Sequence, residues 1–120
     1  MMKPKARDYL AVYITAKDRT EALKLGRWLV RERLAACANI LGPVQSVYRW
    51  KGRVEEAGEA ALLAKTTGAS WPELVRRVKE RHSYETPCIV AFAIRAGYRP
   101  FLEWITAESL PIIRRSQRRN

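Results

Sequence analysis

The pattern of apolar and polar positions predicts four strands and three helices. Apolar runs rich in β-branched and aromatic residues indicate strands at 9–15, 36–50, 53–66 and 88–94. Apolar residues at helical spacing indicate helices at about 18–33 and 70–81, and a short closing helix at 99–110. The order is βαββαβ plus a terminal helix. It indicates an α+β, ferredoxin-like fold with a four-stranded antiparallel sheet and helices on one face.

The two middle strands should form an unusually long β-hairpin. Lys51-Gly52 is a tight-turn signal between arms of about 14 residues each, whereas about 5 or 6 is the common strand length. Gly42-Pro43 interrupts the first arm, and we expect a bulge or bend there because proline cannot donate within a ladder. A ribbon of this length overhangs a one-domain sheet, so we expect another subunit to cover its exposed edges.

Capping signals place the starts of two helices. Asp18 with Glu21, and Ser70 with Glu73, have the spacing of a capping box. Glu73 also precedes Arg77 by four residues, which is the favourable order for an ion pair on a helix.

The length of 120 residues suits a single domain, which we place at 9–110. A flexible N-terminus at 1–8 and a basic C-terminal tail at 111–120 should flank it. No stretch approaches the roughly 20 apolar residues that cross a membrane, and no signal-peptide core follows the basic start. We therefore expect a cytoplasmic protein without a membrane partner.

The net charge of +11 is the strongest compositional signal. Four tail arginines supply part of it, and 11 − 4 leaves +7 on the rest of the chain. Such a field attracts nucleic acid, so non-specific nucleic-acid binding is one interpretation. The tip YRWKG (48–52) could stack bases on Tyr48 and Trp50. The RNA-recognition signature of aromatic residues is absent, however, and packing of the two rings against another strand or subunit is the favoured interpretation.

The sequence contains no motif of a known catalytic site. It has neither a P-loop nor a dinucleotide-binding fingerprint, and with one histidine it has no two-histidine metal motif. Cys37 and Cys88 form neither a disulfide framework nor a CxxC pair, and both lie in apolar surroundings. We interpret them as reduced core thiols and expect a protein that is not an enzyme.

His82 is the only histidine, in the segment RHSYETP (81–87). Pro87 disfavours helix just before it, so the second helix should end here, where a histidine can offset the negative end of the helix dipole. A second interpretation makes His82 and Glu85 ligands of a divalent ion such as Cu²⁺ or Zn²⁺, which imidazole suits. One histidine and one carboxylate cannot complete a site, so water or a neighbouring subunit would have to supply the rest.

Several separated segments resemble the CutA family, the CutA1-type divalent-cation tolerance proteins. They are LAACANI, VYRWKG, LAKTT, HSYETP and FLEWI, in the family's order and spacing across residues 9–109. The resemblance implies a ferredoxin-like subunit in a homotrimer, similar in architecture to the PII signalling proteins, with long hairpins extending across subunits. It also implies that Tyr48 and Trp50 pack between subunits.

The resemblance implies a non-enzymatic role in tolerance of divalent metal ions, chiefly copper, or PII-like binding of a small anionic ligand. Its site residues would be His82 and Glu85 for metal, and Cys37, Lys65 and Tyr84 as candidates in a ligand cleft. Some members have a cysteine where this chain has Ile14 and a second histidine where it has Arg81, and the family usually has proline at Ser83. Because an arginine repels a cation, we expect the metal to bind weakly.

Overall fold

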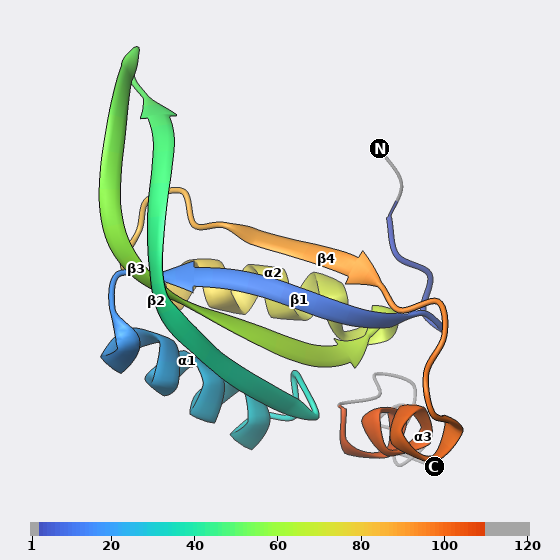
Figure 1. The fold of residues 1–120 in the computed structure, drawn as a ribbon. Coiled ribbons are helices and arrows are strands. Elements are labelled where there is room, and N and C mark those ends of the chain that lie inside the picture. The colour runs from blue at the N-terminus through green and yellow to red at the C-terminus, as the bar shows by residue number, and fades with distance from the viewer. Residues whose placement is uncertain (1–2, 110–120) are drawn as a thin grey trace.

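The described chain, residues 3–109 of this computed structural model, has four strands and three α-helices in the predicted order. They are β1 (Tyr9–Ala16), α1 (Arg19–Arg31), β2 (Cys37–Trp50), β3 (Arg53–Thr67), α2 (Trp71–Arg81), β4 (Ile89–Ala93) and α3 (Arg99–Glu108), with a 3₁₀ turn, η1 (Gly68–Ser70), before α2. The strands form one antiparallel sheet in the order β2-β3-β1-β4 (Figure 1). The α+β, ferredoxin-like fold with a closing helix is confirmed.

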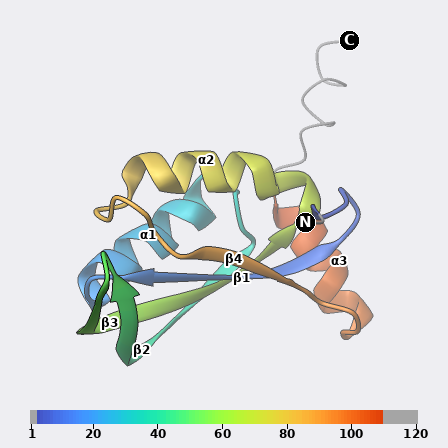
Figure 2. The same cartoon turned by 90° about the horizontal axis from the view of Figure 1, so that it is seen from above.

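The core lies between the sheet and helices α1 and α2, which cover one of its faces (Figure 2). Leu10, Val12 and Ile14 of the central strand β1 are each at most 2% exposed, because alternate residues of a strand face the same side. They pack in one cluster with Leu29 of α1 and Leu74 of α2. Burial of each such side chain contributes roughly 1.5–3 kcal/mol, which fixes β1 between the two helices.

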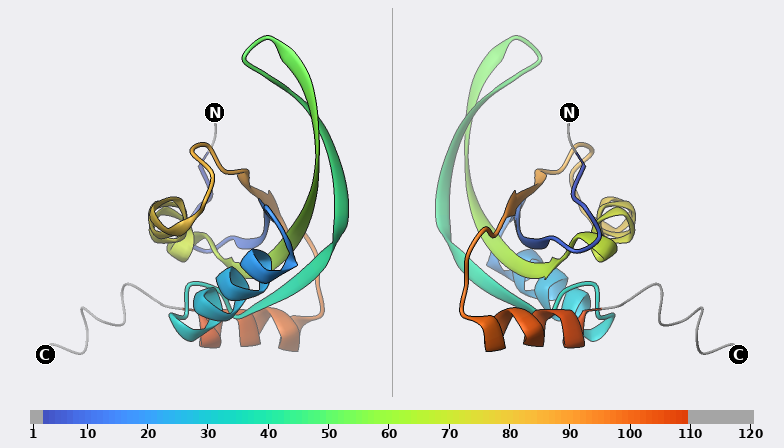
Figure 3. Two further views of the ribbon diagram at one scale, coloured as in Figure 1. Left: turned by 90° about the vertical axis from the view of Figure 1, so that its left-hand side faces the viewer. Right: turned by 90° about the vertical axis from the view of Figure 1, so that its right-hand side faces the viewer.

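The β2–β3 hairpin extends far beyond the rest of the sheet. β1 pairs with β3 only as far as Ala60, whereas β2 and β3 stay paired to Trp50 and Arg53. We call the overhanging residues 44–59 the hairpin arm. The arm makes the subunit 53 Å long, against 31 and 30 Å in the other directions, and it curves as it leaves the sheet (Figure 3). The predicted overhang is confirmed.

Both predicted irregularities of the hairpin are present. Lys51 and Gly52 have positive φ angles of 51° and 78°, as the turns preferred in two-residue hairpins require. The register of β2 on β3 shifts between Leu41 and Val44, which places a bulge at Gly42-Pro43.

Helix α1 begins as predicted and ends slightly early. The carboxylate of Asp18 accepts the Glu21 N–H at 2.9 Å, which caps the first turn. The helix ends at Arg31 rather than near Arg33, because Arg33 adopts the left-handed region at φ 61°. The Arg33 guanidinium then donates to carbonyls at the end of α3, including that of Ala107 at 2.7 Å. It thereby joins the ends of the two helices.

Two predictions for α2 are wrong. Ser70 ends a 3₁₀ turn, with helical φ and ψ of −85° and −13°, and its side chain makes no cap hydrogen bond. A capping residue needs extended backbone for its side chain to reach the N–H groups of the helical residues that follow it. Glu73 pairs with Arg76 at 2.7 Å, and not with Arg77, which reaches across to Glu32 of the neighbouring helix at 2.9 Å.

The N-terminal segment is attached to the fold through the turn that precedes α2. Lys5 and Asp8 hydrogen-bond to each other through backbone and side chain, at 2.9 and 2.8 Å. The Gly68 N–H donates to the Asp8 carbonyl at 2.8 Å, and the Ala69 N–H makes a similar bond. The part of the predicted flexible N-terminus nearest β1 therefore has defined contacts, while the predicted basic tail lies outside the described residues.

Candidate functional site

A cleft of about 890 Å³ opens between the hairpin arm, β1 and the loop from α2 to β4. Among its lining residues are Tyr48, Trp50, Glu59, Tyr84, Glu85 and Cys88. The fold creates this cleft because the arm overhangs the sheet, and because the loop leaves α2 at the same end of β1.

Glu59 of β3 is the most strongly bonded carboxylate in the cleft. The Tyr84 hydroxyl donates to one of its oxygens at 2.5 Å, and the Ser46 hydroxyl donates to the other. Burial, and then the bond to the Glu59 carboxylate, raise the pKa of Tyr84 above its usual range, so the phenol keeps its proton. These bonds fix the loop after α2 against the base of the arm.

The cleft thiol is poorly suited to nucleophilic chemistry. Burial, and secondarily the charge of Glu59, raise the pKa of Cys88, and the thiolate is the nucleophilic form. Cys88 also lies just before β4 and is partly buried, whereas we predicted it inside a strand. Cys37 opens β2 and is likewise only partly buried.

His82 lies at the carboxyl end of α2, and its side chain is 0% exposed. Its Nε2 lies 2.7 Å from the carbonyl oxygen of Thr15, and its Nδ1 accepts the Tyr84 N–H at 3.0 Å. The two bonds fit one neutral tautomer, with the proton on Nε2 donated to Thr15. Both ring nitrogens are thus used by the backbone, which joins the end of α2 to the end of β1.

Glu21 of α1 completes this corner. Its carboxylate accepts the Lys17 N–H at 3.0 Å, and both the N–H and the hydroxyl of Ser83 at 2.9 Å. Partial burial acts to raise the pKa of Glu21, but the hydrogen bonds outweigh it and lower this pKa below 4.5. An oxygen of Glu21 lies 3.8 Å from Nδ1 of His82, so a charged carboxylate lies directly beside the ring.

The structure separates the predicted site residues into three places. Tyr48, Trp50, Tyr84 and Glu85 line the cleft, and His82 lies in the buried corner beside it. Cys37 and Lys65 face each other across the β2–β3 ladder, where the Lys65 ammonium donates to the Asn39 side chain. Within residues 3–109, no three His, Cys, Asp or Glu side chains are grouped so that they could hold a metal ion. Metal and ligand roles for these residues stay predictions.

Sequence reasoning assigned no site role to Glu59 and missed the second role of Glu21. Glu21 had a signal as a capping residue, but its bonds to Ser83 join positions 62 residues apart. Glu59 is one of three glutamates in the string VEEAGEA, and no local feature distinguishes it from the other two.

No helix in residues 3–109 is long and apolar enough to cross a membrane.

Comparison with known proteins identifies the family. The chain matches the family profile described as CutA1 divalent ion tolerance protein over residues 10–108. It is 43% identical over 94 residues to the divalent-cation tolerance protein CutA of Archaeoglobus fulgidus, and 46% identical over 94 residues to that of Thermus thermophilus. Each alignment spans 78% of this chain and 91% of the relative.

Solved structures agree in fold. The Thermus thermophilus protein superposes with a TM-score of 0.83 at 42% identity, covering 85% of this chain and 99% of the other. CutA1 from Oryza sativa gives 0.84 at 31% identity, covering 88% and 96%. The Archaeoglobus fulgidus structure gives 0.78 at 41% identity, covering 81% and 94%, and it is described as periplasmic, so a cytoplasmic location here stays a prediction. This chain belongs to the CutA1 divalent ion tolerance protein family.

Proposed function

We propose that this protein acts in divalent-cation tolerance as a non-enzymatic homotrimer that binds a divalent ion, Cu²⁺ in particular, only weakly. The observation that carries the proposal is the family match over nearly the whole described chain. The predicted ligands are His82 of the buried corner and Glu85 of the adjacent cleft, with water or a neighbouring subunit completing the coordination.

The geometry of the corner supports weak rather than tight binding. His82 uses both ring nitrogens on backbone partners, so an ion would have to displace the Tyr84 N–H to reach Nδ1. Glu85 is exposed and free to contribute a carboxylate. Arg81, directly before His82, adds a positive charge that opposes a cation. Borderline ions such as Cu²⁺ accept imidazole and carboxylate together, which favours this pair over either residue acting singly.

A calorimetric titration with Cu²⁺ tests the site. We would compare the wild type with His82→Ala and Glu85→Gln, with Glu103→Gln on exposed α3 as the matched control. Saturable binding near one ion per subunit, lost in the first two variants and kept in the third, supports the proposal. Equal binding by all four proteins contradicts the site. Circular dichroism on His82→Ala should accompany the titration, because this variant also removes two structural hydrogen bonds.

The exposed hairpin arm supports the proposed homotrimer. Its Val47 and Val54 are 63% and 64% exposed, and Tyr48 and Trp50 at the tip are over 40% exposed. Apolar surface of this kind, on strands whose outer edges have no partner in the subunit, indicates an interface. Trp50→Ala should lower the mass measured by light scattering, while Trp50→Phe, which keeps an aromatic ring, should lower it less. An unchanged trimer in Trp50→Ala would contradict the packing role.

The cleft favours a second candidate function, binding of a small anionic ligand in a PII-like signalling trimer. Its volume of about 890 Å³ lies within the usual range of ligand pockets, and Lys17 and Arg49 provide positive charge among its lining residues. A thermal-shift screen with nucleotides, organic phosphates and dicarboxylates would test it, since a ligand of the native state raises its stability. A shift that Arg49→Gln abolishes would support this candidate, and no shift with any compound would contradict it.

A further inference from the structure

The two helices on the outer face carry a group of basic side chains that the proposed metal role does not use. Three lie on one face of α1, at helical spacing, and two lie on the facing side of α2. They are Lys24, Arg27 and Arg31 of α1, and Arg77 and Arg81 of α2. We call these five residues the basic ridge.

One buried aromatic ring, that of Trp28, contacts two of the five ridge residues. Trp28 of α1 is 7% exposed, and the guanidinium carbons of Arg77 and Arg81 lie 5.3 and 4.4 Å from the centre of its ring. Lys24 and Arg31 are one helical turn from Trp28 on either side. Positive charge from both helices is therefore concentrated along the seam where α1 and α2 meet.

Most of this charge has no compensating carboxylate. Arg77 pairs with Glu32 at 2.9 Å. In the part of the chain that the structure describes, the remaining ridge residues take part in no ion pair: Lys24, Arg27, Arg31 and Arg81. Four unpaired cations on one face favour a partner that supplies several negative charges.

The ridge borders a pocket of about 430 Å³, lined in part by Lys17, Lys24 and Arg81. Two carboxylates also line the pocket, but both are engaged within the protein. Asp18 accepts the N–H of Glu21, and Glu21 accepts three hydrogen bonds of its own. The three cations outnumber the two carboxylates, so the pocket keeps a net positive charge, and its volume offers room for a phosphate group.

We propose that the basic ridge binds the phosphate backbone of nucleic acid without regard to sequence. Lysine and arginine bind phosphate oxygens by charge-assisted hydrogen bonds, and several such contacts add up along a polyanion. Trp28 is buried beneath two arginines, so the ridge offers no exposed ring on which a base could stack. The contact is therefore with the backbone.

The apolar residues of these helices argue against a membrane surface as the partner. A helix that lies in a membrane interface presents an apolar face to the lipid. The large apolar side chains of α1 and α2 face the sheet, and on these two helices only Val30, at 40%, is among the exposed large hydrophobic residues of the described chain.

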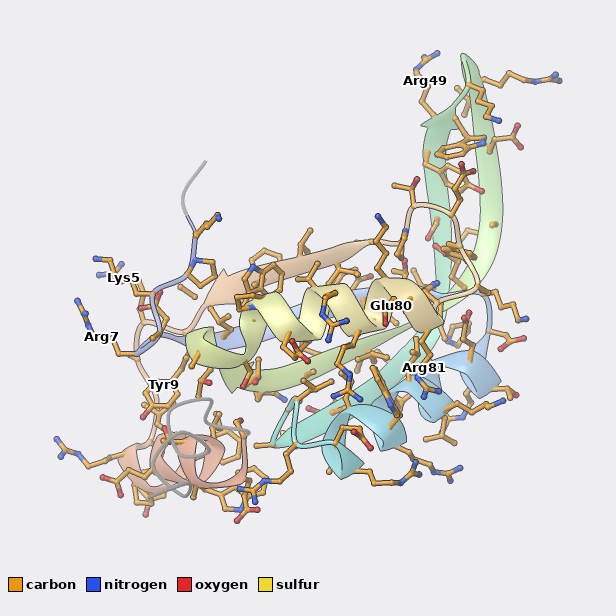
Figure 4. All side chains as sticks on the ribbon, turned by 180° about the vertical axis from the view of Figure 1, so that it is seen from behind. Lys5, Arg7, Tyr9, Arg49, Glu80 and Arg81 are labelled. Atoms are coloured by element: carbon orange, nitrogen blue, oxygen red, sulfur yellow. The ribbon has the colours of Figure 1, made fainter. Side chains whose placement is uncertain are left out.

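A pair of charge-matched variants of the full chain tests the proposal. The ridge variant is Lys24→Gln, Arg27→Gln and Arg31→Gln, where glutamine keeps good helix propensity. The control is Lys3→Gln, Lys5→Gln and Arg7→Gln, also exposed. Each lowers the net charge from +11 to 11 − 3 = +8. Lys5 and Arg7 lie at the opposite end of the molecule from Arg81 (Figure 4).

The measurement is fluorescence anisotropy of a labelled mixed-sequence oligonucleotide, single-stranded and duplex, over a range of salt concentrations. The wild type should bind, with affinity that falls steeply as salt rises. The ridge variant should bind about tenfold or more weakly at 0.1 M salt, and its log–log salt slope should fall by about 3, one for each lost phosphate contact. The control should stay near the wild type.

Four outcomes would overturn the proposal. The first is no binding by the wild type at about 0.1 M salt, a concentration at which backbone contacts still act. The second is an equal loss in both variants, which would assign the effect to net charge. The third is competition by polyglutamate as effective as by unlabelled oligonucleotide, which would indicate an acidic protein. The fourth is ridge-dependent binding to phosphatidylserine vesicles but not to oligonucleotide.

Discussion

The most informative single perturbation is His82→Ala, which should lower the free energy of unfolding by about 2–4 kcal/mol. His82 is buried at the junction of α2 and β1, where it makes one hydrogen bond to each of two backbone groups. Its removal separates two interpretations of this residue, a structural link and a metal ligand available to an ion.

The magnitude follows from the two hydrogen bonds. The variant leaves the Thr15 carbonyl and the Tyr84 N–H without their partner, and each unpaired buried group costs about 1–3 kcal/mol. Removing a ring whose side chain is 0% exposed adds a cavity term. Water entering the vacated space recovers part of this loss, which places the sum at about 2–4 kcal/mol rather than at the upper limit.

Urea unfolding at neutral pH, one fixed protein concentration and without metal measures the effect. His82→Asn places an oxygen near Nδ1 and can still accept the Tyr84 N–H, and His82→Gln places an N–H near Nε2 for Thr15. Each should therefore be less destabilising than alanine. A loss below about 1 kcal/mol in His82→Ala, with all three variants alike, would refute the structural role of both bonds.

Three further predictions concern packing and pH. A Cβ at Gly68 would lie 1.8 Å from the Lys5 carbonyl oxygen, so Gly68→Ala should displace the N-terminal segment and cost about 2–3 kcal/mol in urea unfolding. The pKa of Glu21 is lowered by folding, so its carboxylate stabilises the native state above about pH 4.5, and that stabilisation is lost as the pH falls further. Glu21→Gln should therefore weaken the fall of the free energy of unfolding with decreasing pH, measured by urea unfolding at a series of acid pH values. The pKa of Tyr84 is raised, mainly by burial and then by Glu59, so the protonated phenol stabilises the native state below pH 10.0, the ordinary tyrosine pKa, and this stabilisation is lost at higher pH. Tyr84→Phe should remove a late step from the ultraviolet titration of the tyrosines.

Each of these three has a control in the same chain. Gly58→Ala adds the same methyl group in open space on β3 and should be neutral or slightly stabilising. If Gly68→Ala lowers the free energy of unfolding equally in the full chain and in a chain that lacks residues 2–7, the clash with the Lys5 carbonyl is not the cause. Glu103→Gln on exposed α3 should leave the acid dependence intact, and an equal change there would argue against Glu21. If the late titration step persists in Tyr84→Phe, that step comes from another tyrosine.

Much of the backbone could be predicted from local sequence. The strands, to within one residue at each end, the Lys51-Gly52 turn, the Gly42-Pro43 bulge and the Asp18 cap were correct, because each depends on backbone preferences within a few residues. The Ser70 cap failed for a reason that the sequence does not reveal. The 3₁₀ turn η1 precedes α2, and its Gly68 and Ala69 N–H groups hydrogen-bond to carbonyls of the N-terminal segment. Ser70, the last residue of η1, therefore already has helical backbone.

The candidate site depends on contacts between distant positions, and there the sequence was insufficient. It selected His82, Tyr84 and Glu85, but the bonds of this corner join residues 67, 62 and 25 positions apart. The sequence therefore did not identify Thr15, Glu21 and Glu59 as partners, and the one local signal among them was the capping position of Glu21.

The sequence by itself determined which segments become strands and helices, where the hairpin turns, and which family the segments resemble, since these depend on short-range backbone preference and on the order of motifs. Only the tertiary structure decided which side chains share a surface. It buried both nitrogens of His82, placed Lys65 away from Tyr84, and joined the basic faces of α1 and α2 over Trp28. The physical reason is that packing of the core sets the relative positions of whole elements, and each polar group then bonds to whatever group that arrangement brings within reach.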